Sequence, residues 1–359
     1  MRTTVLALVV MCVCATGAQA SGGLPPLPAR WPKTLELGMM DLPGDAAALR
    51  KAAPFGFRYQ YLAGGVNTGQ GWATWNPGGS FVTRYDRESW AAGEIPVFSY
   101  YMLLQSKPAG GDEAQVDLSH LRDAELMRAY WADVRLFFRR AHGTKTVVLH
   151  VEPDLWGYLE QAGDVSLARS FAQEFVRLRD QLAPNVLLAY HMSGWGTKHD
   201  IVYEDPSDAV VRGYAAQSAA FYRALDARFD VAFEDFSDRD AGFYAKQQGN
   251  AKTWFTPADF ARFYIQDSIA SGIIPVFTYY MLLQSLPGGG GESAAVFANL
   301  NNTATMTAYY NDLTLFFQKA AAFPSQTIVF SFSAASYSEQ RSMAATKSNT
   351  VPPAPHAKH

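Results

Sequence analysis

The chain has 359 residues, of which 48% are hydrophobic and 18% are charged, and its formal net charge is −3. This composition supports a large packed core and excludes disorder over the whole length. The small net charge and the lack of a long basic run argue against nucleic acid or an acidic membrane surface as the main partner.

The first twenty residues have the features of a secretory signal peptide. Arg2 provides a positive charge, residues 5–15 are apolar, and Ala18-Gln19-Ala20 fits the small-x-small pattern that signal peptidase recognises. We therefore expect residues 1–20 to be removed after Ala20 and the protein to be secreted or periplasmic. Both cysteines lie in this peptide, so we expect no disulfide. No later apolar segment is long enough for a membrane anchor.

After a Pro-rich lead at residues 21–33, apolar runs of strand length alternate with helical patterns through residues 34–340. The predicted strands are 35–40, 57–63, 95–103, 146–152, 186–192, 230–236, 274–282 and 327–332. The clearest predicted helices are 118–140, 166–182, 207–227, 257–271 and 303–321. This alternation predicts a single α/β domain with a parallel sheet closed into a (β/α)₈ TIM-type barrel. An open doubly wound sheet is the alternative, but the Gly-rich phosphate loop expected after its first strand is absent.

One segment of the sequence occurs twice. Residues 95–106 and 274–285 differ only at Ser99, which Thr278 replaces, and the similarity extends over about 74–141 and 253–320. The repeat relates the predicted third strand to the seventh, whereas the first and fifth strands look unrelated. We interpret it as a copied unit, which leaves an irregular C-terminal third open as an alternative. The polar, proline-containing residues 341–359 are predicted to form a disordered tail.

Functional residues of parallel barrels lie at the C-terminal ends of the strands and in the loops that follow. Side chains alternate along a strand, so the apolar set is expected to face the helices and the polar set the interior. On the sixth strand this places Phe233 toward the helices. The expected interior residues are Arg58, Gln60, His150, Glu152, His191 and Glu234. Ionisable groups in a packed interior are costly unless they pair or take part in chemistry.

Two carboxyl groups across a cleft are the minimum equipment for glycoside hydrolysis, because one protonates the leaving oxygen and the other attacks the sugar or activates water. We predict that Glu152 and Glu234 are this catalytic pair. Neighbouring cations and burial would tune their pKa values. Residues expected to bind substrate or support the pair are Arg58, Gln60, Tyr100, Tyr101, His150, Asp154, Trp156, His191, Trp195 and Asp235. The predicted partner is a carbohydrate, and no metal or other cofactor is expected.

The segment Val151-Glu152-Pro153-Asp154 resembles the Glu-Pro-Asp motif of the family six cellulases, the cellobiohydrolases and endoglucanases. The later strand that ends in Gly194-Trp195 looks similar as well. This resemblance implies a parallel-barrel glycoside hydrolase. The chain departs from that family because no carboxylate follows its third strand. It also departs from the large retaining barrel clan, which has Asn where this chain has Val151 and a Glu on the seventh strand where this chain has none.

Two other functions stay open. A metal-dependent hydrolase is one, although the spacing of the candidate ligands matches no zinc motif. Those ligands are His150, Glu152, Asp154, His191, His199, Asp200 and Asp235. A non-catalytic exported carbohydrate-binding barrel is the other, and the missing strand-seven carboxylate favours it. Chelation would inactivate the first, and the second would bind glycan without turnover.

Overall fold

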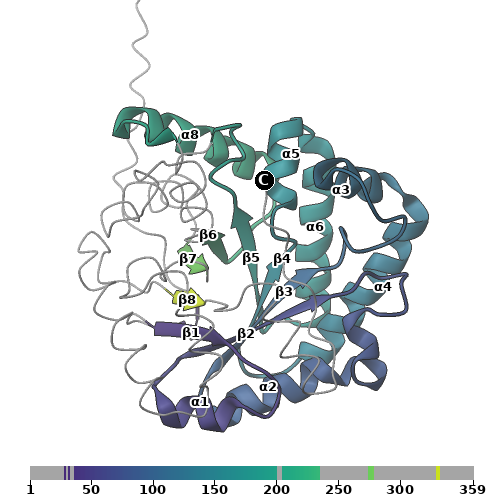
Figure 1. Cartoon of the computed structure of the whole chain (residues 1–359), viewed down its shortest axis with the longest axis vertical. Coiled ribbons are helices and arrows are strands. Elements are labelled where there is room, and N and C mark those ends of the chain that lie inside the picture. The colour runs from purple at the N-terminus through teal and green to yellow at the C-terminus, as the bar shows by residue number, and fades with distance from the viewer. Residues whose placement is uncertain are drawn as a thin grey trace, which may run out of the picture.

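The computed structural model describes residues 28–29, 31–32, 36–199, 204–234, 274–278 and 329–331. Within these ranges the chain forms an α/β fold with a parallel sheet (Figure 1). The predicted signal peptide, most of the Pro-rich lead, most of the second repeat copy and the tail lie outside the described residues. The predicted helices 257–271 and 303–321 also lie outside them.

Every predicted strand overlaps an observed one. The strands are β1 (Glu36–Met40), β2 (Phe57–Ala63), β3 (Ile95–Tyr101), β4 (Val147–Val151), β5 (Val186–Met192), β6 (Val231–Glu234), β7 (Ile274–Thr278) and β8 (Val329–Ser331). The helices are α1 (Ala46–Ala52), α2 (Ser80–Ala92), α3 (Glu113–Arg122), α4 (Ala124–Ala141), α5 (Leu155–Ala162), α6 (Val165–Leu182) and α8 (Asp208–Ala224). None of the described helices is both long and apolar enough to cross a membrane.

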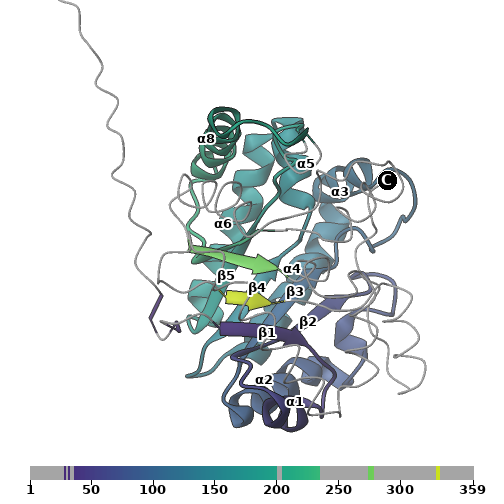
Figure 2. The same ribbon diagram turned by 60° about the vertical axis from the view of Figure 1, so that its left-hand side comes forward.

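Each strand pairs in parallel with the next, and β8 pairs with β1, so the strand order is that of a closed barrel. Figure 2 shows β7, β8 and β1 side by side, as these pairings require. The two copies of the repeated segment begin β3 and β7. The segments after β6 and β7, where a complete set of eight units requires helices, lie outside the described residues.

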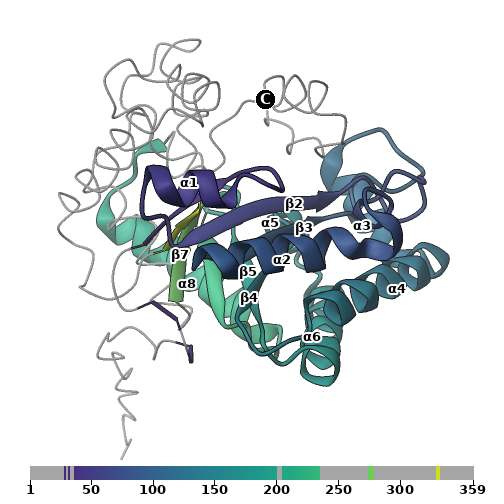
Figure 3. The ribbon, with the colours of Figure 1, turned by 90° about the horizontal axis from the view of Figure 1, so that it is seen from below.

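The main core lies between the strands and the helices that cover them, and α2 runs across β2 and β3 (Figure 3). Helix α4 buries Leu126, Tyr130, Val134 and Phe138 at a spacing of four residues, which forms one apolar stripe. The prediction of one continuous helix over 118–140 is wrong, because Asp123 separates α3 from α4. Its backbone is extended, and its carboxylate accepts hydrogen bonds from the first backbone N–H groups of α4, which makes it an N-cap.

Asp86 of α2 is an unfavourable group in this core. It is 1% exposed, and neither carboxyl oxygen has a hydrogen-bond partner in the described part of the chain. Burial raises the pKa of Asp86 well above its usual value.

Replacing Asp86 by leucine, which has a similar shape, is expected to raise the free energy of unfolding by about 1–3 kcal/mol, because an unsatisfied buried polar group is removed. Urea unfolding at pH 7 measures the change. Asp86→Asn is the matched control, and it should gain less because it keeps a buried polar group. A destabilised leucine variant would show that Asp86 bonds to a group outside the described residues.

Candidate functional site

Four side chains from β2 to β5 form a continuous hydrogen-bonded chain. The Tyr59 hydroxyl donates to Ser99 Oγ at 2.7 Å, and Ser99 Oγ lies 2.6 Å from His150 Nδ1. His150 Nε2 lies 2.9 Å from His191 Nδ1. The His150 ring also contacts Phe233 of β6, with ring centroids 4.3 Å apart. Since β4 and β6 are not neighbours in the sheet, these contacts run through the interior, which confirms the inward orientation predicted for His150 and His191.

His150 is poorly suited to bind a metal ion. Burial and the neighbouring His191 hold its pKa well below the usual range, so the ring is neutral, and both of its nitrogens are engaged. Elsewhere, His199 lies 3.1 Å from Glu204, and Asp200 lies outside the described residues. Among the side chains that the structure describes, no group of three or more His, Cys, Asp or Glu could hold a metal ion.

The predicted interior position of Arg58 is wrong. Its Nε donates to both carboxyl oxygens of Asp41, at 2.9 and 2.7 Å, and its Nη1 donates to Ser89 of α2 at 3.1 Å. The guanidinium also lies 4.1 Å from the centroid of the Tyr85 ring, which belongs to α2 as well. Arg58 therefore lies between the strands and α2, where a buried cation finds the carboxylate that compensates for its desolvation.

Gln60 lies on the same face of β2 as Arg58, two residues further along the strand. Its Nε2 donates to the backbone oxygen of Asp41 at 3.0 Å, so it ties the ends of β1 and β2 together. The interior positions of β2 belong instead to Tyr59 and Tyr61, whose rings are 5.3 Å apart. Tyrosine suits the interior because its ring fills space and its hydroxyl finds a partner there.

The prediction that Phe233 of β6 faces the helices is also wrong, because its ring lies in the interior against His150. Glu234 is the last residue of β6, and its side chain lies outside the described part of the structure. Asp235 follows it and lies outside the described residues. The pairing of Glu152 with Glu234 therefore stays a prediction.

The backbone is strained where β4 ends. Glu152 and Asp154 have φ values of 37° and 70°, in the left-handed region that non-glycine residues rarely adopt, and they flank Pro153. We call Glu152-Pro153-Asp154 the Glu-Pro-Asp turn. Strained non-glycine residues cost of order 1–3 kcal/mol each and cluster at functional sites.

The strained backbone turns the Glu152 side chain away from the interior, so its predicted inward orientation is wrong. Its Oε1 accepts hydrogen bonds from the backbone N–H groups of Met102 and Leu103, at 3.1 and 3.2 Å. It also accepts one from the Tyr130 hydroxyl of α4 at 2.7 Å. Glu152 is 1% exposed, and burial raises its pKa to about 8 despite these three hydrogen bonds, so it is protonated at neutral pH.

Carboxyl groups from two parts of the chain gather around Tyr101, the last residue of β3. The Tyr101 hydroxyl donates to Glu113 Oε1 of α3 at 3.1 Å. Burial raises the pKa of Tyr101, and the nearby charges of Asp154, Glu113 and Asp117 raise it further. Asp154 and Glu113 are half-buried, so both reach the surface beside Tyr101. We call this group, at the C-terminal ends of β3 and β4, the mouth.

An aromatic pair lies beside the mouth. Trp195, from the loop after β5, packs on Tyr158 of α5 with ring centroids 5.0 Å apart. Gly157 permits this packing, because a Cβ there would lie 2.4 Å from the Trp195 ring. The charge of Asp154 helps raise the pKa of Tyr158, after burial, which places this pair near the Glu-Pro-Asp turn. Trp195 is half-buried and keeps part of its surface exposed.

Two aromatic residues predicted to bind substrate lie instead in the core. Trp156 is buried, donates from Nε1 to the Val151 oxygen at 2.8 Å, and packs on Tyr190. Tyr100 is buried and donates its hydroxyl to Asp133 of α4. Tyr100 lies on the helix-facing side of β3, because alternation along the strand turns its neighbour Tyr101 inward, and Trp156 belongs to α5.

The sequence reasoning missed Glu113 and Asp117. They belong to α3, which begins before the helical pattern assigned from residue 118 onward. Asp112 caps this helix by accepting a hydrogen bond from the N–H of Gln115 at 3.1 Å. The Asp112-Glu113 pair, an acidic helix start, was the local signal that could have located the helix correctly.

No protein-family model matches the chain, and no curated protein matches it. Among solved structures, the chain is similar to a GH26 beta-mannanase from Bacteroides ovatus, with 15% identity and a TM-score of 0.49, over 84% of this chain and 81% of that one. It is also similar to an engineered protein, with 14% identity and a TM-score of 0.47, over 84% of this chain and 63% of that one. Similarities this distant assign no function.

Proposed function

We propose that the chain is a secreted glycoside hydrolase with a (β/α)₈ barrel that acts on a glycan at the mouth. The observation that supports this most is the Glu-Pro-Asp turn at the end of β4, where two strained residues carry carboxyl groups. Ligands of parallel barrels bind at this end of the strands. Secretion rests on the predicted signal peptide.

In this proposal Asp154 and Glu113 are the carboxyl groups that contact the glycan. Both are half-buried and flank Tyr101, whereas Glu152 is enclosed by Tyr130 and the backbone at the end of β3. Glu152 is then a positioning residue that holds the turn against β3. Trp195 offers an apolar ring face beside Asp154, which suits contact with a sugar ring.

The pair of Glu152 and Glu234 is the competing assignment. A general acid must be protonated at the working pH, and the pKa of about 8 keeps Glu152 in that state. For this assignment Glu152 would have to exchange its hydrogen bond with Tyr130 for one with the leaving oxygen of the substrate.

Variants at the mouth test the assignment. We expect Asp154→Asn and Glu113→Gln to lower kcat on a hydrolysed glycan by about 10²- to 10⁴-fold, because the loss of an acid or base has that effect. Release of reducing ends from soluble glucans, mannans and xylans measures the rate. Asp180→Asn, an exposed position on α6, is the matched control and should keep full activity.

Different outcomes separate the alternatives. Loss of activity only in Glu152→Gln and Glu234→Gln would overturn the roles of Asp154 and Glu113 and support the competing pair. Loss of activity after chelation would support the metal-dependent hydrolase. A non-catalytic glycan-binding barrel is favoured by the enclosure of Glu152, and binding of a glycan without release of reducing ends would identify it.

A further inference from the structure

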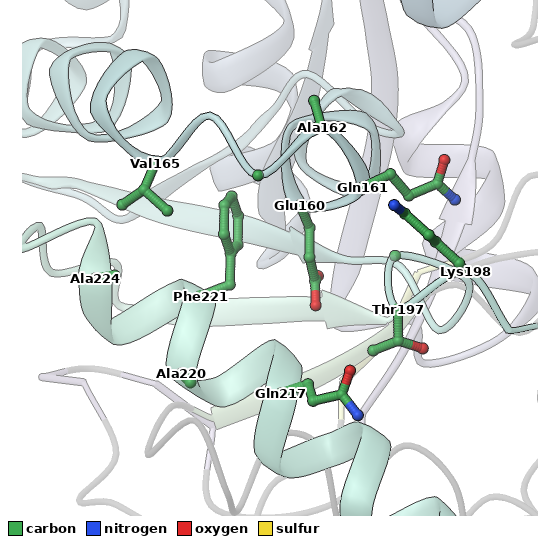
Figure 4. Close-up of a pocket in the computed structure, with 12 residues that line it drawn as sticks. Glu160, Gln161, Ala162, Val165, Thr197, Lys198, Gln217, Ala220, Phe221 and Ala224 are labelled. Atoms are coloured by element: carbon green, nitrogen blue, oxygen red, sulfur yellow. The ribbon is translucent and has the colours of Figure 1, made fainter.

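A cavity of about 640 Å³ lies between α5, the loop after β5, and α8 (Figure 4). It is formed by residues that the assignment of the mouth does not use. Its polar and aromatic lining consists of Glu160, Gln161, Thr197, Lys198, Gln217 and Phe221. We call it the lateral cavity.

Glu160 is the central polar group of the lateral cavity. Figure 4 shows its carboxyl group between Phe221 and Thr197. The Ser218 hydroxyl donates to Glu160 Oε1 at 3.0 Å, which fixes the side chain from α8. Gly196 lets the other oxygen approach the loop, because a Cβ there would lie 2.6 Å from Glu160 Oε2. Glu160 is half-buried, so it stays accessible from the cavity.

Two further groups provide hydrogen-bonding capacity. Thr197 Oγ1 is buried and has no hydrogen-bond partner among the described residues. Buried hydroxyl groups are nearly always hydrogen-bonded, and Thr197 Oγ1 has hydrogen-bonding capacity that no described residue uses. Gln161 donates from Nε2 to the backbone oxygen of Trp195 at 3.0 Å. This hydrogen bond orients the side-chain amide of Gln161, and the side-chain oxygen takes no part in it.

The lining of the cavity disfavours anionic ligands. A carboxyl group at the centre disfavours phosphates and other anions, and the only lysine of the lining, Lys198, is exposed. The volume lies within the range of small-molecule sites, about 300–1,000 Å³. A hydroxyl-rich neutral ligand can donate hydrogen bonds to Glu160, and Phe221, which is 8% exposed, adds an apolar contact for the C–H groups of a sugar.

We propose that the lateral cavity binds a neutral saccharide unit, as a glycan-binding site separate from the mouth. The inference rests on the lining of the cavity alone and does not require hydrolysis at the mouth. It adds a second point of attachment for a glycan, next to the loop that carries Trp195.

The test uses a variant that fills the cavity and a matched control on the same helix. Ala220 lines the cavity and is exposed on α8. The phenylalanine ring of Ala220→Phe therefore occupies the cavity without displacing a buried side chain. Ala216 is also exposed on α8 but does not line the cavity, and Ala216→Phe is the control. Cellobiose and mannobiose are titrated at millimolar concentration into the full secreted chain, and binding is followed by saturation-transfer NMR and calorimetry.

We expect Ala220→Phe to weaken disaccharide binding by about tenfold or more, a loss of about 1.4 kcal/mol, and Ala216→Phe to leave it unchanged. Glucose 6-phosphate should bind more weakly than the neutral sugars, and Glu160→Gln should reduce that difference. Equal binding by the two alanine variants, or no disaccharide binding to the wild-type chain, would overturn the proposal.

A comparison with Asp154→Asn separates this inference from the proposed function. Disaccharide binding that Asp154→Asn abolishes and Ala220→Phe spares would place the sugar only at the mouth and overturn the lateral site. Binding that depends on Ala220, in a chain that hydrolyses no glycan, would support the lateral site and overturn the proposed hydrolase.

Discussion

Replacing Arg58 by alanine is expected to lower the free energy of unfolding by about 3–5 kcal/mol, the typical cost of breaking a buried ion pair. The Arg58 side chain is completely buried, and its Nε donates to both oxygens of Asp41 and lies 3.7 Å from Glu94. Alanine would leave the Asp41 carboxylate buried without its cation. It would also remove the stacking on the Tyr85 ring.

Urea unfolding at pH 7 measures this effect, with two variants for comparison. Arg58→Lys keeps the charge but loses the planar fork that contacts Asp41 and Ser89, so an intermediate loss is expected. Arg177→Ala is the matched surface control, because its ion pair with Glu174 is solvent-exposed and should matter little. Equal losses for Arg58→Ala and Arg177→Ala would contradict the role assigned to the buried pair.

The stability of Glu152→Gln relative to the wild-type chain is expected to rise with pH. The folded pKa of Glu152 is about 8, against an ordinary value of 4.5. Between these values the folded chain holds a proton that the unfolded chain has released. The stability that this group contributes is therefore complete below about pH 4.5 and is lost as the pH rises through 8.

The size of this effect follows from the linkage between protonation and folding. Each pH unit within this window costs the wild-type chain up to about 1.4 kcal/mol, so the difference between pH 5 and pH 8 approaches about 4 kcal/mol. Glutamine does not titrate, and its carbonyl oxygen can still accept hydrogen bonds from Met102, Leu103 and Tyr130.

The free energy of unfolding of both chains, measured from pH 5 to pH 8, checks this expectation. Asp180→Asn serves again as the control, since its carboxyl group is exposed and its replacement should produce no such slope. A constant difference between Glu152→Gln and the wild-type chain would mean that Glu152 is ionised at neutral pH. It would then be unsuitable both as a buried neutral group and as a general acid.

The sequence by itself determined the strands and their order. The bounds predicted for β2 and β5 are those observed, and the repeated segment begins both β3 and β7. Apolar runs of strand length and polar helix starts are local signals, and they need no knowledge of distant residues. The inward orientation of His150 and His191 was also predicted correctly, because the opposite faces of their strands carry large apolar or aromatic side chains.

The tertiary structure decided which face of β2 and β6 is the interior. Alternation divides a strand into two sets of side chains, but it does not say which neighbours each set meets. Arg58 faces α2 because Asp41 lies there to balance its charge. Phe233 faces the interior because it packs on the His150 ring.

The site depended on tertiary structure even more. Glu152 leaves the alternation of β4 because its φ of 37° redirects the side chain toward Tyr130, and no spacing of residue types reports a backbone angle. Glu113 reaches Tyr101 only because α3 folds back over the end of β3. Sequence periodicity therefore determined which residues share a face of an element. The partners that stabilise a buried charge come from distant parts of the chain, and only the fold brings them together.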